Sequence, residues 1–594
     1  MKIINKKYKL LDFAKIPFTV SPGMVSLQVL NKIINALIPS LQVLATAAFI
    51  DTSINIFSGQ ADRTQIIWPL ICIFLLISYQ YVSNALIGLV KAKINIKLTE
   101  TYRIASTEKR ATLEYCHMEN NETMELINRV GGDPTGWIAG GFNFLLYMAE
   151  LIIRVCSILF VLAAQVWWAA IVIFAFSVPL FKLAEKSGKV TYEASKEAAK
   201  HTRRAQYLQG VLTGRDNVEE RALFAYSDQL NKRWHEKFMT AYKIHFKAER
   251  RRLIKMKSAS MITLLISFLI VGVLLAPLSS GAISIGMFMG LVSATFSLVQ
   301  AMSWELAYIT SELVKHREFI RDFSVFAQLS EKQGATDLPV EYITQPECIE
   351  FREVSFAYPG IDTMILKNLN MKLYAHKHYA FVGINGAGKT TITKLLTGLY
   401  DNYTGDILID GKNLRNFTQA ELKALFSVVY QDFAKYQLPM LESIGIGNVH
   451  AMSTAEIESA IRLLELNEVV DKLPNGLNTP LGKIREGGVD ISGGEWQRVA
   501  IARTLVNRAP IHILDEPTAA LDPVAESAIY EMFGKISKGK STIFITHRLG
   551  AARLADVIFV IADGHVAEQG PHDMLIEQGG IYAEMFESQR GWYV

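Results

Sequence analysis

Cysteine and charge are both scarce in this 594-residue chain. Its four cysteines cannot form the framework of a disulfide-stapled fold, and two of them, Cys72 and Cys156, lie inside apolar runs. The formal net charge is only +4, which gives no argument for a nucleic-acid partner. Half of the residues are hydrophobic and only 20% are charged, less than a soluble chain of this size needs at its surface. We therefore exclude collagen and disordered chains, and we expect lipid to surround part of the protein.

The first half of the chain contains the segments that a bilayer would cover. Six apolar runs each approach or exceed the ~20 residues that a helix needs to cross the hydrocarbon core. They are residues 24–50, 65–90, 137–164, 166–186, 259–277 and 282–304. Buried helices of a soluble bundle rarely stay apolar on all sides over such a length. We therefore predict a transmembrane domain over residues 24–320, built from six membrane helices.

The stretches between the apolar runs predict the orientation in the membrane. Residues 91–135 and 187–258 are long, rich in Lys and Arg, and helical in composition. Basic residues at 250–257 directly flank an apolar run, which predicts that this side is cytoplasmic by the positive-inside rule. Six membrane helices then put both termini in the cytoplasm. We expect the helices to continue beyond the bilayer, with distal tips near residues 118–125 and 213–221.

Two segments flank the predicted transmembrane domain. Residues 1–23 contain lysines among apolar side chains, but neither an apolar core nor a small-residue cleavage site of a signal peptide. We predict a short amphipathic segment on the inner membrane surface, with a flexible terminus as the alternative. Residues 321–345 are polar and are predicted to be a linker. Residues 346–594 then alternate strand-like and helical stretches, as in a soluble α/β domain with its own core.

A phosphate-binding loop lies in this second half. Residues 383–390 match the pattern of that loop in full. They follow an apolar strand at 379–382 and open a helix at 391–396, which is the context that the motif requires. The glycines leave backbone N–H groups free to surround phosphate oxygens, and the helix N-terminus adds positive potential. We expect Lys389 to reach the β- and γ-phosphates of a nucleotide and the Thr390 hydroxyl to bind Mg²⁺.

A second strand-like run, residues 511–516, ends in two acids. We expect Asp515 to hold Mg²⁺ and Glu516 to polarise the water that attacks the γ-phosphate of ATP. His512 lies inside the same run, and we interpret it as a packed histidine with satisfied hydrogen bonds rather than as a ligand.

Between these motifs, Ile491, Ser492, Gly493, Gly494 and Glu495 resemble the Leu-Ser-Gly-Gly-Gln signature of the ATP-binding cassette (ABC) family. The first and last positions differ from the signature, but the central Ser-Gly-Gly is intact. A hydroxyl and bare N–H groups at the start of a helix offer a further anion site. The resemblance implies that two cassettes face each other head to tail, so that this segment completes the nucleotide site of a partner copy.

More residues match the family in chain order. Tyr358 resembles the aromatic that stacks on adenine, and Gln431 resembles the Q-loop glutamine that contacts Mg²⁺ and links the cassette to the membrane domain. Asp522 resembles the D-loop aspartate, and His547 resembles the switch histidine at the γ-phosphate. The residues that the resemblance assigns are, for catalysis, Glu516 and His547; for Mg²⁺, Thr390, Gln431 and Asp515; and for ATP, Tyr358, Gly383, Asn385, Gly386, Ala387, Gly388, Lys389, Thr390, Thr391, Gln431, Ser492, Gly493, Gly494 and Asp522.

Six apolar spans ahead of one cassette resemble an exporter-type half-transporter of the ABC family. The resemblance covers nearly the whole chain and implies a membrane α-helical domain with the ABC exporter fold, joined to an α/β P-loop NTPase domain. It also implies a homodimer in which ATP closes the cassettes, the membrane helices flip from inward to outward opening, and hydrolysis resets them. We expect a multi-pass protein of the bacterial inner (plasma) membrane, in contact with the lipid bilayer and with no nucleic acid as partner.

The cargo is predicted from a weaker resemblance. Residues 481–490 and Trp496 are similar to bacterial exporters of lantibiotics and other modified peptides, so we expect a peptide. The cysteine protease that precedes the spans of some peptide exporters is not expected, because the first cysteine is Cys72, and another protein would cut any leader. A lipid flippase or multidrug exporter, an importer built on the exporter fold, and an ATP-gated membrane protein that does not pump remain alternatives. The spans exclude a soluble ABC protein acting on DNA or ribosomes.

Polar residues interrupt several of the apolar runs. Glu150 and Arg154 lie four residues apart, so they share a helix face and are expected to pair. Glu305 follows the sixth span, and the second span is broken by Ser78, Tyr79, Gln80, Tyr81, Ser83 and Asn84. These residues predict either a wet cavity for a polar or amphipathic cargo or hydrogen bonds between helices.

Overall fold

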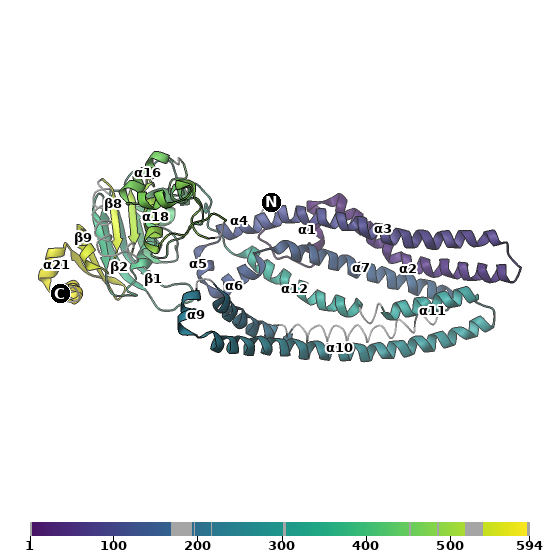
Figure 1. Cartoon of the computed structure of the whole chain (residues 1–594). Helices are drawn as coiled ribbons and strands as arrows, with labels where there is room; N and C mark the ends of the chain where they lie inside the picture. The colour runs from purple at the N-terminus through teal and green to yellow at the C-terminus, as the bar shows by residue number, and fades with distance from the viewer. Residues whose placement is uncertain are drawn as a thin grey trace. The chain divides into compact units, whose positions relative to one another are not determined.

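The computed structural model describes residues 3–167, 171, 190, 193–194, 196–214, 217–300, 305–450, 453–483, 486–516 and 539–590. The chain forms two compact units (Figure 1). A helical unit contains residues 1–110 and 125–329, and a cassette unit contains residues 111–124 and 330–594. The short segment 111–124 therefore interrupts the helical unit in sequence and belongs in space to the cassette unit.

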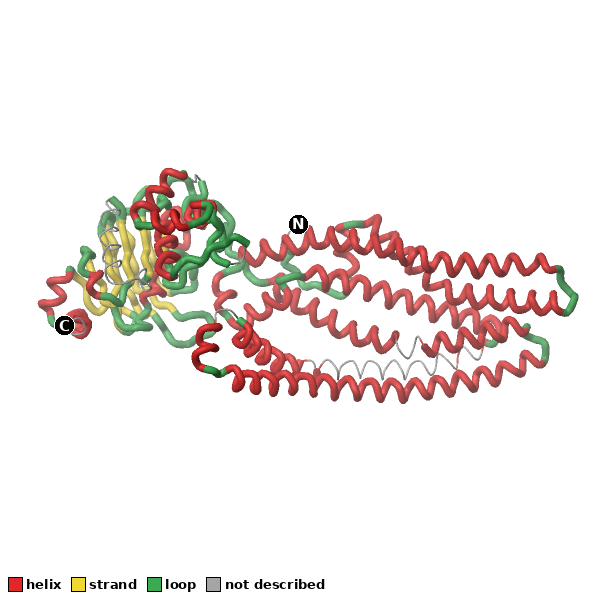
Figure 2. Tube along the Cα trace, in the orientation of Figure 1, coloured by secondary structure: helices red, strands yellow, loops and turns green. Residues whose placement is uncertain are grey.

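Long helices build the helical unit (Figure 2). The described helices are α1 (Asp12–Val20), α2 (Pro22–Phe57), α3 (Ile67–Leu98), α4 (Ile104–Thr112), α6 (Asn121–Val130), α7 (Pro134–Gln165), α9 (Val218–Phe224), α10 (Ser227–Ser279), α11 (Ile285–Gln300) and α12 (Leu306–Gln328). Local sequence sets several of their ends. Pro22 takes the first position of α2, where its missing N–H costs nothing. The Asp133 carboxylate caps α7 by accepting a hydrogen bond from the Thr135 N–H at 3.1 Å.

Length and apolar composition mark the membrane helices. Among the described residues, three helical stretches are long and apolar enough to cross a bilayer, namely Pro22–Phe57, Arg63–Thr112 and Pro134–Gln165. Two shorter apolar helices cover Ser267–Ser279 and Ile285–Leu298. These five segments overlap the first, second, third, fifth and sixth predicted spans. The fourth predicted span, residues 166–186, lies almost entirely outside the described residues.

Small residues let α11 approach α2 closely. A Cβ added to Gly286 would lie 2.2 Å from the Ala47 carbonyl oxygen, and one added to Gly290 would lie 3.0 Å from the Val43 carbonyl oxygen. The Asp51 carboxylate on α2 also accepts a hydrogen bond from the Gly286 N–H at 2.7 Å, which satisfies one N–H of the first turn of α11. Close backbone contact through small residues is a common way to pack helices in a membrane, where lipid removes the hydrophobic drive between them.

The charged side chains of the helical unit pair between helices. Lys32 on α2 forms an ion pair with Glu150 on α7 at 2.6 Å, and Arg154 on α7 pairs with Glu305, just before α12. The predicted pairing of Glu150 with Arg154 is therefore wrong, because each side chain finds an opposite charge on another helix. A hydrogen bond of 3.4 Å from the Asn31 amide to the Tyr79 hydroxyl also joins α2 to α3. Of the two predicted alternatives, a wet cavity or polar contacts between helices, the structure shows the second for these residues.

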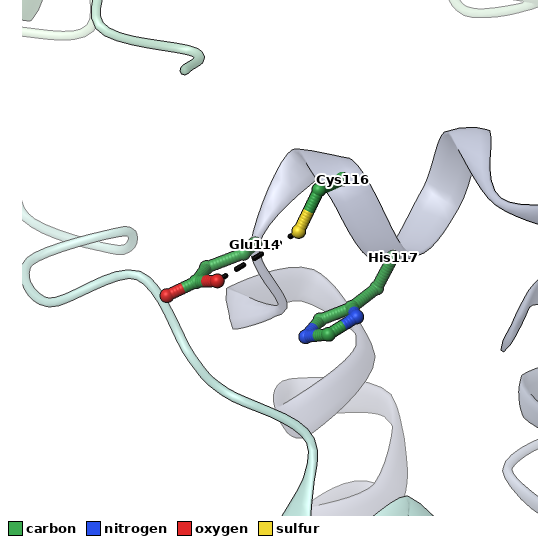
Figure 3. A group of neighbouring side chains, drawn as sticks. All are labelled: Glu114, Cys116 and His117. Carbon is green, nitrogen blue, oxygen red and sulfur yellow. Dashed lines mark hydrogen bonds between the residues drawn. The ribbon is translucent and has the colours of Figure 1, made fainter. Parts of the chain in front are cut away.

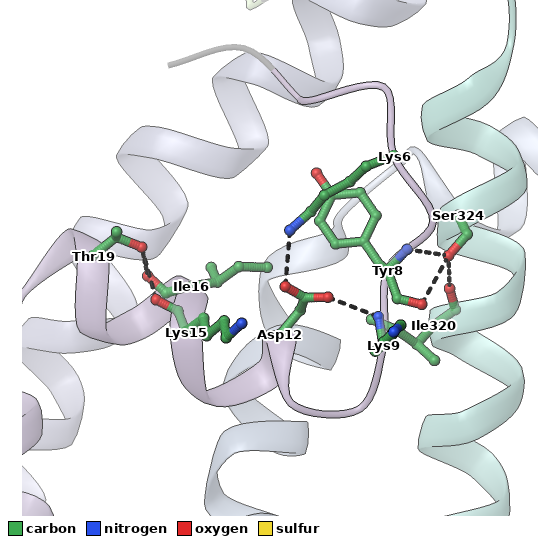
Figure 4. A network of polar contacts seen from close by, with 9 residues as sticks. All are labelled: Lys6, Tyr8, Lys9, Asp12, Lys15, Ile16, Thr19, Ile320 and Ser324. Carbon is green, nitrogen blue, oxygen red and sulfur yellow. Dashed lines mark hydrogen bonds and ion pairs between the residues drawn. The ribbon is translucent and has the colours of Figure 1, made fainter.

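The N-terminal segment packs against protein rather than lying free (Figure 4). Ser324 on α12 accepts a hydrogen bond from the Tyr8 N–H at 2.9 Å and donates to the Tyr8 carbonyl at 3.3 Å. Asp12, the first residue of α1, pairs with Lys6 at 2.8 Å. Phe13 is fully buried. The predicted amphipathic segment thus forms a helix only from Asp12 onward. Other helices of the same unit cover Phe13 and Ile16, whereas Leu11 and Phe18 stay exposed.

Two sheets form the centre of the cassette unit. An antiparallel sheet has the order β2-β1-β4-β5 and contains β1 (Cys348–Phe356), β2 (Leu366–Tyr374), β4 (Thr404–Ile409) and β5 (Lys412–Asn413). A six-stranded sheet has the order β10-β9-β3-β8-β7-β6 and contains β3 (His378–Val382), β6 (Phe426–Val429), β7 (Ile511–Asp515), β8 (Ser541–Ile545), β9 (Val557–Ala562) and β10 (His565–Gly570). Its pairs are parallel except for β9 with β10. Every residue of β7 and β8 is buried, as expected for strands covered on both faces.

The described helices of the cassette unit are shorter. They are α5 (Tyr115–Glu119), α13 (Lys389–Leu396), α14 (Gln419–Leu425), α15 (Met440–Gly445), α16 (Thr454–Leu463), α17 (Asn467–Lys472), α18 (Gly493–Leu505), α20 (Leu549–Ala552), α21 (His572–Gln578) and α22 (Ile581–Arg590). The linker predicted over 321–345 begins later than expected, because α12 continues to Gln328 with Phe323 and Phe326 fully buried. The carboxyl ends of parallel β3, β7 and β8 meet at one edge of the sheet, where α/β proteins bind their ligands.

Candidate nucleotide-binding site

A cleft of about 740 Å³ opens at this edge of the sheet. It is lined by Tyr358, Ile365, Asn385, Gly386, Gly388, Lys389, Thr390, Thr391, Gln431, Glu516 and His547. All of these except Ile365 were expected from the sequence to bind nucleotide or act on it. Residues more than 180 positions apart in sequence are thus brought together in one cleft.

The loop between β3 and α13 depends on glycine. Gly383 has a φ of +148°, and a Cβ there would lie 2.2 Å from the Ile561 carbonyl oxygen. Gly388 has a φ of +103°, and a Cβ there would lie 2.7 Å from the Leu366 side chain. Both positions therefore exclude a side chain by conformation and by space. The loop backbone runs directly into the N-terminus of α13, which favours binding of an anion.

Lys389 provides a buried cation at the start of α13. Its ammonium group donates hydrogen bonds to the carbonyl oxygens of Gly383 at 2.9 Å and Ile384 at 3.0 Å. Burial lowers the pKa of Lys389, and the nearby carboxylates of Glu516 and Asp515 oppose that shift. The neutral carbonyls fix the ammonium within the loop but leave its charge available to an anion in the cleft.

Thr390 and Asp515 offer a pair of oxygens suited to a hard cation. The Thr390 hydroxyl donates to Asp515 Oδ1 at 3.3 Å, and no described group bonds the buried Asp515 Oδ2. Burial raises the pKa of Asp515 to about 6, and the Glu516 charge adds to that shift. A buried carboxylate oxygen without a partner fits Mg²⁺, which prefers oxygen ligands. Of the three predicted Mg²⁺ ligands, Thr390 and Gln431 line the cleft, and Asp515 reaches it through its hydrogen bond with Thr390.

Glu516 and His547 form an acid–imidazole pair across the cleft. His547 Nε2 lies 2.7 Å from Glu516 Oε1. Glu516 has a φ of +48°, and its N–H donates to the Ile545 carbonyl at 2.9 Å, which fixes the backbone just after β7. Burial and the Lys389 charge lower the pKa of His547, while Glu516 opposes them. A carboxylate next to an imidazole can hold and orient a water molecule.

No signal in the sequence predicted the residue that supports His547. Gln589, on α22, donates a hydrogen bond to the His547 carbonyl oxygen and accepts one from the Leu549 N–H at 2.9 Å. It thereby ties the end of the chain to the loop after β8. The only sequence clue would be an amide side chain on a helix predicted near the C-terminus, which is too common to be informative.

Tyr358 joins the cleft to an aromatic cluster. Its hydroxyl lies 2.9 Å from the Thr391 hydroxyl, and its ring packs edge-on against Tyr400 at 5.6 Å between centroids. The Lys394 ammonium lies 5.3 Å from the centroid of the Tyr358 ring and equally far from that of Tyr115. The aromatic that was expected to stack on adenine is therefore held by contacts to α13 and to Tyr400.

Helix α5 docks directly on this cluster. The Glu119 carboxylate pairs with the Lys394 ammonium at 2.6 Å and accepts a hydrogen bond from the Tyr400 hydroxyl. Tyr115 packs edge-on against Tyr400 at 5.5 Å between centroids. The tip predicted near residues 118–125 thus contacts the helix that follows the phosphate-binding loop, within the cassette unit itself.

The signature segment lies elsewhere on the cassette. The Ser492 hydroxyl accepts a hydrogen bond from the Glu495 N–H at 3.3 Å, and the Glu495 carboxylate accepts one from the Ser492 N–H at 2.7 Å. This capping box starts α18 and explains how Glu495 is tolerated where the family has glutamine. Ser492 and Gly493 are exposed and, like Gly494, do not line the cleft. Asp522 lies outside the described residues.

His512 differs in part from the interpretation of its sequence. It is buried in β7 as expected, and its Nε2 lies 3.0 Å from the Lys540 ammonium. Its Nδ1, however, has no hydrogen-bond partner among the described residues, so the expectation of a fully satisfied ring is wrong. Burial, with a smaller effect of the Lys540 charge, lowers the pKa of His512 to about 3, which keeps the ring neutral.

Comparison with known proteins assigns this site to a family. Residues 366–519 match the family described as ABC transporter. The chain is also 40% identical over 243 residues to the ATP-dependent lipid A-core flippases of Escherichia coli (strain K12) and Shigella flexneri. Residues 366–519 form an ABC transporter domain. The chain spans 41% of the length of these flippase relatives, and the match covers 41% of the chain.

A solved structure shares the fold over almost the whole chain. The structure of a bacterial Atm1-family ABC exporter with ATP bound has a TM-score of 0.74 and 24% sequence identity, and the alignment covers 94% of this chain and 98% of the other. This likeness confirms the prediction of an ABC exporter fold, with a helical membrane domain and an α/β P-loop domain. The cofactor implied by the family match is ATP.

Proposed function

We propose that this ABC transporter chain is one half of a homodimeric, ATP-driven exporter in the inner membrane of a bacterium. The observation that carries the proposal is the Glu516–His547 pair, whose atoms lie 2.7 Å apart, in a cleft that also contains Lys389 and Thr390. Such a cleft can hold the triphosphate of ATP and orient a water molecule beside it. The apolar helices give the chain a membrane domain for that hydrolysis to drive.

The residues of the cleft have separate roles in this proposal. Lys389 neutralises phosphate oxygens, and the backbone of the loop binds others. Thr390, Gln431 and Asp515 hold Mg²⁺, which when bound neutralises charge on the transferred phosphate. Glu516 orients the attacking water and accepts its proton, and His547 donates a hydrogen bond toward the γ-phosphate.

The exposed signature segment supports the homodimer. Ser492 presents its hydroxyl and Gly493 its N–H group at the start of α18, away from the cleft of their own chain. An anion site of this kind is complete only when a second copy brings its own phosphate-binding loop opposite. In the proposed cycle, ATP joins the two cassettes and hydrolysis separates them. The segment 111–124, which contacts α13, passes this change to the membrane helices in lipid.

For the cargo we propose a lantibiotic-like or other modified peptide, on the resemblance of residues 481–490 and Trp496. A lipid is the second candidate, because the relatives reported above are lipid A-core flippases. Both cargoes are amphipathic, and polar contacts such as Gln28 with Asn143 at 2.9 Å lie among the apolar helices that would meet them. The cargo therefore has to be distinguished by experiment.

ATP hydrolysis by the purified chain in lipid nanodiscs tests the proposal. We expect Glu516→Gln to lower the rate of phosphate release by about 10²–10⁴-fold, because it removes the group that takes the proton from water. Binding of a fluorescent ATP analogue should survive in this variant. Lys389→Ala should instead weaken nucleotide binding itself.

Glu495→Gln is the matched control, since it makes the same chemical change at the signature and restores the residue that the family has there. A glutamine oxygen can still accept the Ser492 N–H, so hydrolysis should stay close to that of the wild type. Near-normal hydrolysis by Glu516→Gln would contradict the proposed role of that residue. Stimulation of the wild type by modified peptides would favour peptide export, and stimulation by lipids would favour the flippase. Transport into vesicles would then be measured for the class that stimulates.

A further inference from the structure

Three side chains with different metal-binding atoms lie together at the start of α5. Glu114 directly precedes the helix, and Cys116 and His117 lie in its first turn. One ligand atom from each of the three lies within 4.8 Å of the others. Figure 3 shows the carboxylate, the thiol and the imidazole, with Cys116 Sγ donating to Glu114 Oε2 at 3.8 Å. The nucleotide site and its residues are not part of this group.

A fourth side chain holds the acid and the imidazole together. The Ser330 hydroxyl donates to Glu114 Oε2 at 2.6 Å and lies 2.8 Å from His117 Nε2. Because its hydrogen goes to the carboxylate, the hydroxyl oxygen must accept the hydrogen of Nε2. The backbone adds a further link, since the Glu114 N–H donates to the Ser330 carbonyl at 3.3 Å. The ligand atoms are therefore gathered by the fold before any ion binds, which lowers the cost of ordering them.

The chemistry of the three atoms selects one class of metal. A thiolate, an imidazole nitrogen and a carboxylate oxygen together suit Zn²⁺, whereas Mg²⁺ and Ca²⁺ prefer oxygen ligands alone. Three protein ligands leave a fourth tetrahedral position for water. All three residues are half-buried, so an ion there would keep access to solvent.

The surroundings favour a dication and let it enter. Glu114 lines a cleft of about 550 Å³ together with Glu331, Asp337 and Asp401, and only two basic side chains, Lys332 and Arg415, line the same cleft. An excess of carboxylates raises the local concentration of cations. On its other side, Cys116 lines a second opening of about 400 Å³.

We propose that Glu114, Cys116 and His117 form a binding site for a zinc-type divalent transition metal, with water completing its coordination. The ion would replace the hydrogen bonds through Ser330 that link Glu114 to His117, and it would make the first turn of α5 more rigid. Glu119, which contacts α13, lies in the same short helix. The metal would therefore bind on the segment of the cassette unit that meets the helix after the phosphate-binding loop. This metal site lies outside the nucleotide cleft.

Cobalt(II) titration of the full chain in nanodiscs tests this site. The protein is first stripped of metal with a chelator and is kept free of nucleotide and Mg²⁺. Cobalt bound to a thiolate gives a charge-transfer absorption in the near ultraviolet, and Zn²⁺ added afterwards should displace it. We expect about one ion per chain, in agreement with three protein ligands in a single site. The absorption should be lost in Cys116→Ser, and cobalt binding should weaken about tenfold or more in His117→Gln.

Cys348→Ser is the matched control, because it makes the same change at a cysteine of the same unit that lies at the start of β1, outside the group. It should keep the wild-type absorption. Retention of fluorescent-nucleotide binding by Cys116→Ser would show that the variant is folded. No charge-transfer band in the wild type, a band that persists in Cys116→Ser, or equal loss in Cys348→Ser would each overturn the site. None of these results depends on ATP hydrolysis, so they are separate from failure of the exporter proposal.

Discussion

Two defined heterodimers would test whether Ser492 completes the nucleotide site of a partner chain. One pairs a Lys389→Ala chain with a Ser492→Ala chain. The other pairs a wild-type chain with a chain that carries both changes. The two dimers contain the same pair of substitutions and differ only in how these are distributed. Co-expression with two different tags, followed by purification on both, isolates each dimer.

The location of Ser492 gives the expected rates. Lys389 lines the cleft, whereas Ser492 begins α18 outside it. In the proposed homodimer, each site therefore combines Lys389 of one chain with Ser492 of the other. In the first heterodimer both changes then fall in one site and the other site is intact, which leaves about half of the wild-type hydrolysis if the sites act independently. In the second heterodimer each site carries one change, so hydrolysis should approach that of the fully mutated dimer.

Phosphate release in nanodiscs measures both dimers side by side, with the wild-type and doubly substituted homodimers as references. The test depends on which heterodimer hydrolyses ATP faster. Cooperation between the two sites would lower the rate of the first heterodimer but would not make it slower than the second. If the dimer with both changes on one chain were the more active, Ser492 would act on the cleft of its own chain. Such a result would refute a site shared between Lys389 of one chain and Ser492 of the other.

Two further predictions concern the cleft and the helix beside it. Because burial raises the pKa of Asp515 to about 6, protons compete with Mg²⁺ for its carboxylate below that pH. Mg²⁺-dependent binding of a fluorescent nucleotide should therefore weaken as the pH falls through about 6, by up to about tenfold per pH unit, and Asp515→Asn should bind weakly at every pH. A wild-type affinity that is flat between about pH 5 and 8 would contradict this. Glu119→Gln should lose its ion pair with Lys394, whose atoms lie 2.6 Å apart and whose side chains are partly exposed. A double-mutant cycle with Lys394→Ala, read from unfolding of the cassette, should give a coupling of about 0.5–1.5 kcal/mol, and a coupling near zero would show that the pair is fully screened.

The nucleotide cleft could be predicted from the sequence because its residues belong to short motifs with a fixed local structure. A loop such as 383–390 needs only the strand before it and the helix after it, and both are readable from apolar periodicity. Glu516 and His547 each follow a buried strand, and parallel strands bring such positions to one edge. Because β7 and β8 are neighbours in the sheet, the residues that follow them, Glu516 and His547, lie close together.

The contacts that were missed depend on side chains from distant parts of the chain. Glu150 and Arg154 share a helix face, but the sequence does not reveal that Lys32 and Glu305 lie nearer to them on other helices. Gln589 gave no signal, because its partner is a backbone carbonyl more than forty residues away. Polar composition likewise predicted a linker over residues where α12 in fact continues. The last turns of α12 mix polar residues with apolar ones, and such a mixture resembles an irregular segment when the residues that bury the apolar side chains are unknown.

The discontinuous cassette unit has a consequence for building chimaeric transporters. Residues 111–124 fold with residues 330–594, yet they are encoded inside the helical unit. A graft that replaces the chain from residue 330 onward would bring a foreign surface against Tyr115 and Glu119. The reciprocal graft, which replaces the residues before 330, would leave Lys394 and Tyr400 without their partners. A modular exchange therefore needs two pieces of chain, and selection on either piece alone would be constrained by the other. Compatibility between membrane domains and motors in hybrid proteins should track this short insertion more closely than the position of the linker.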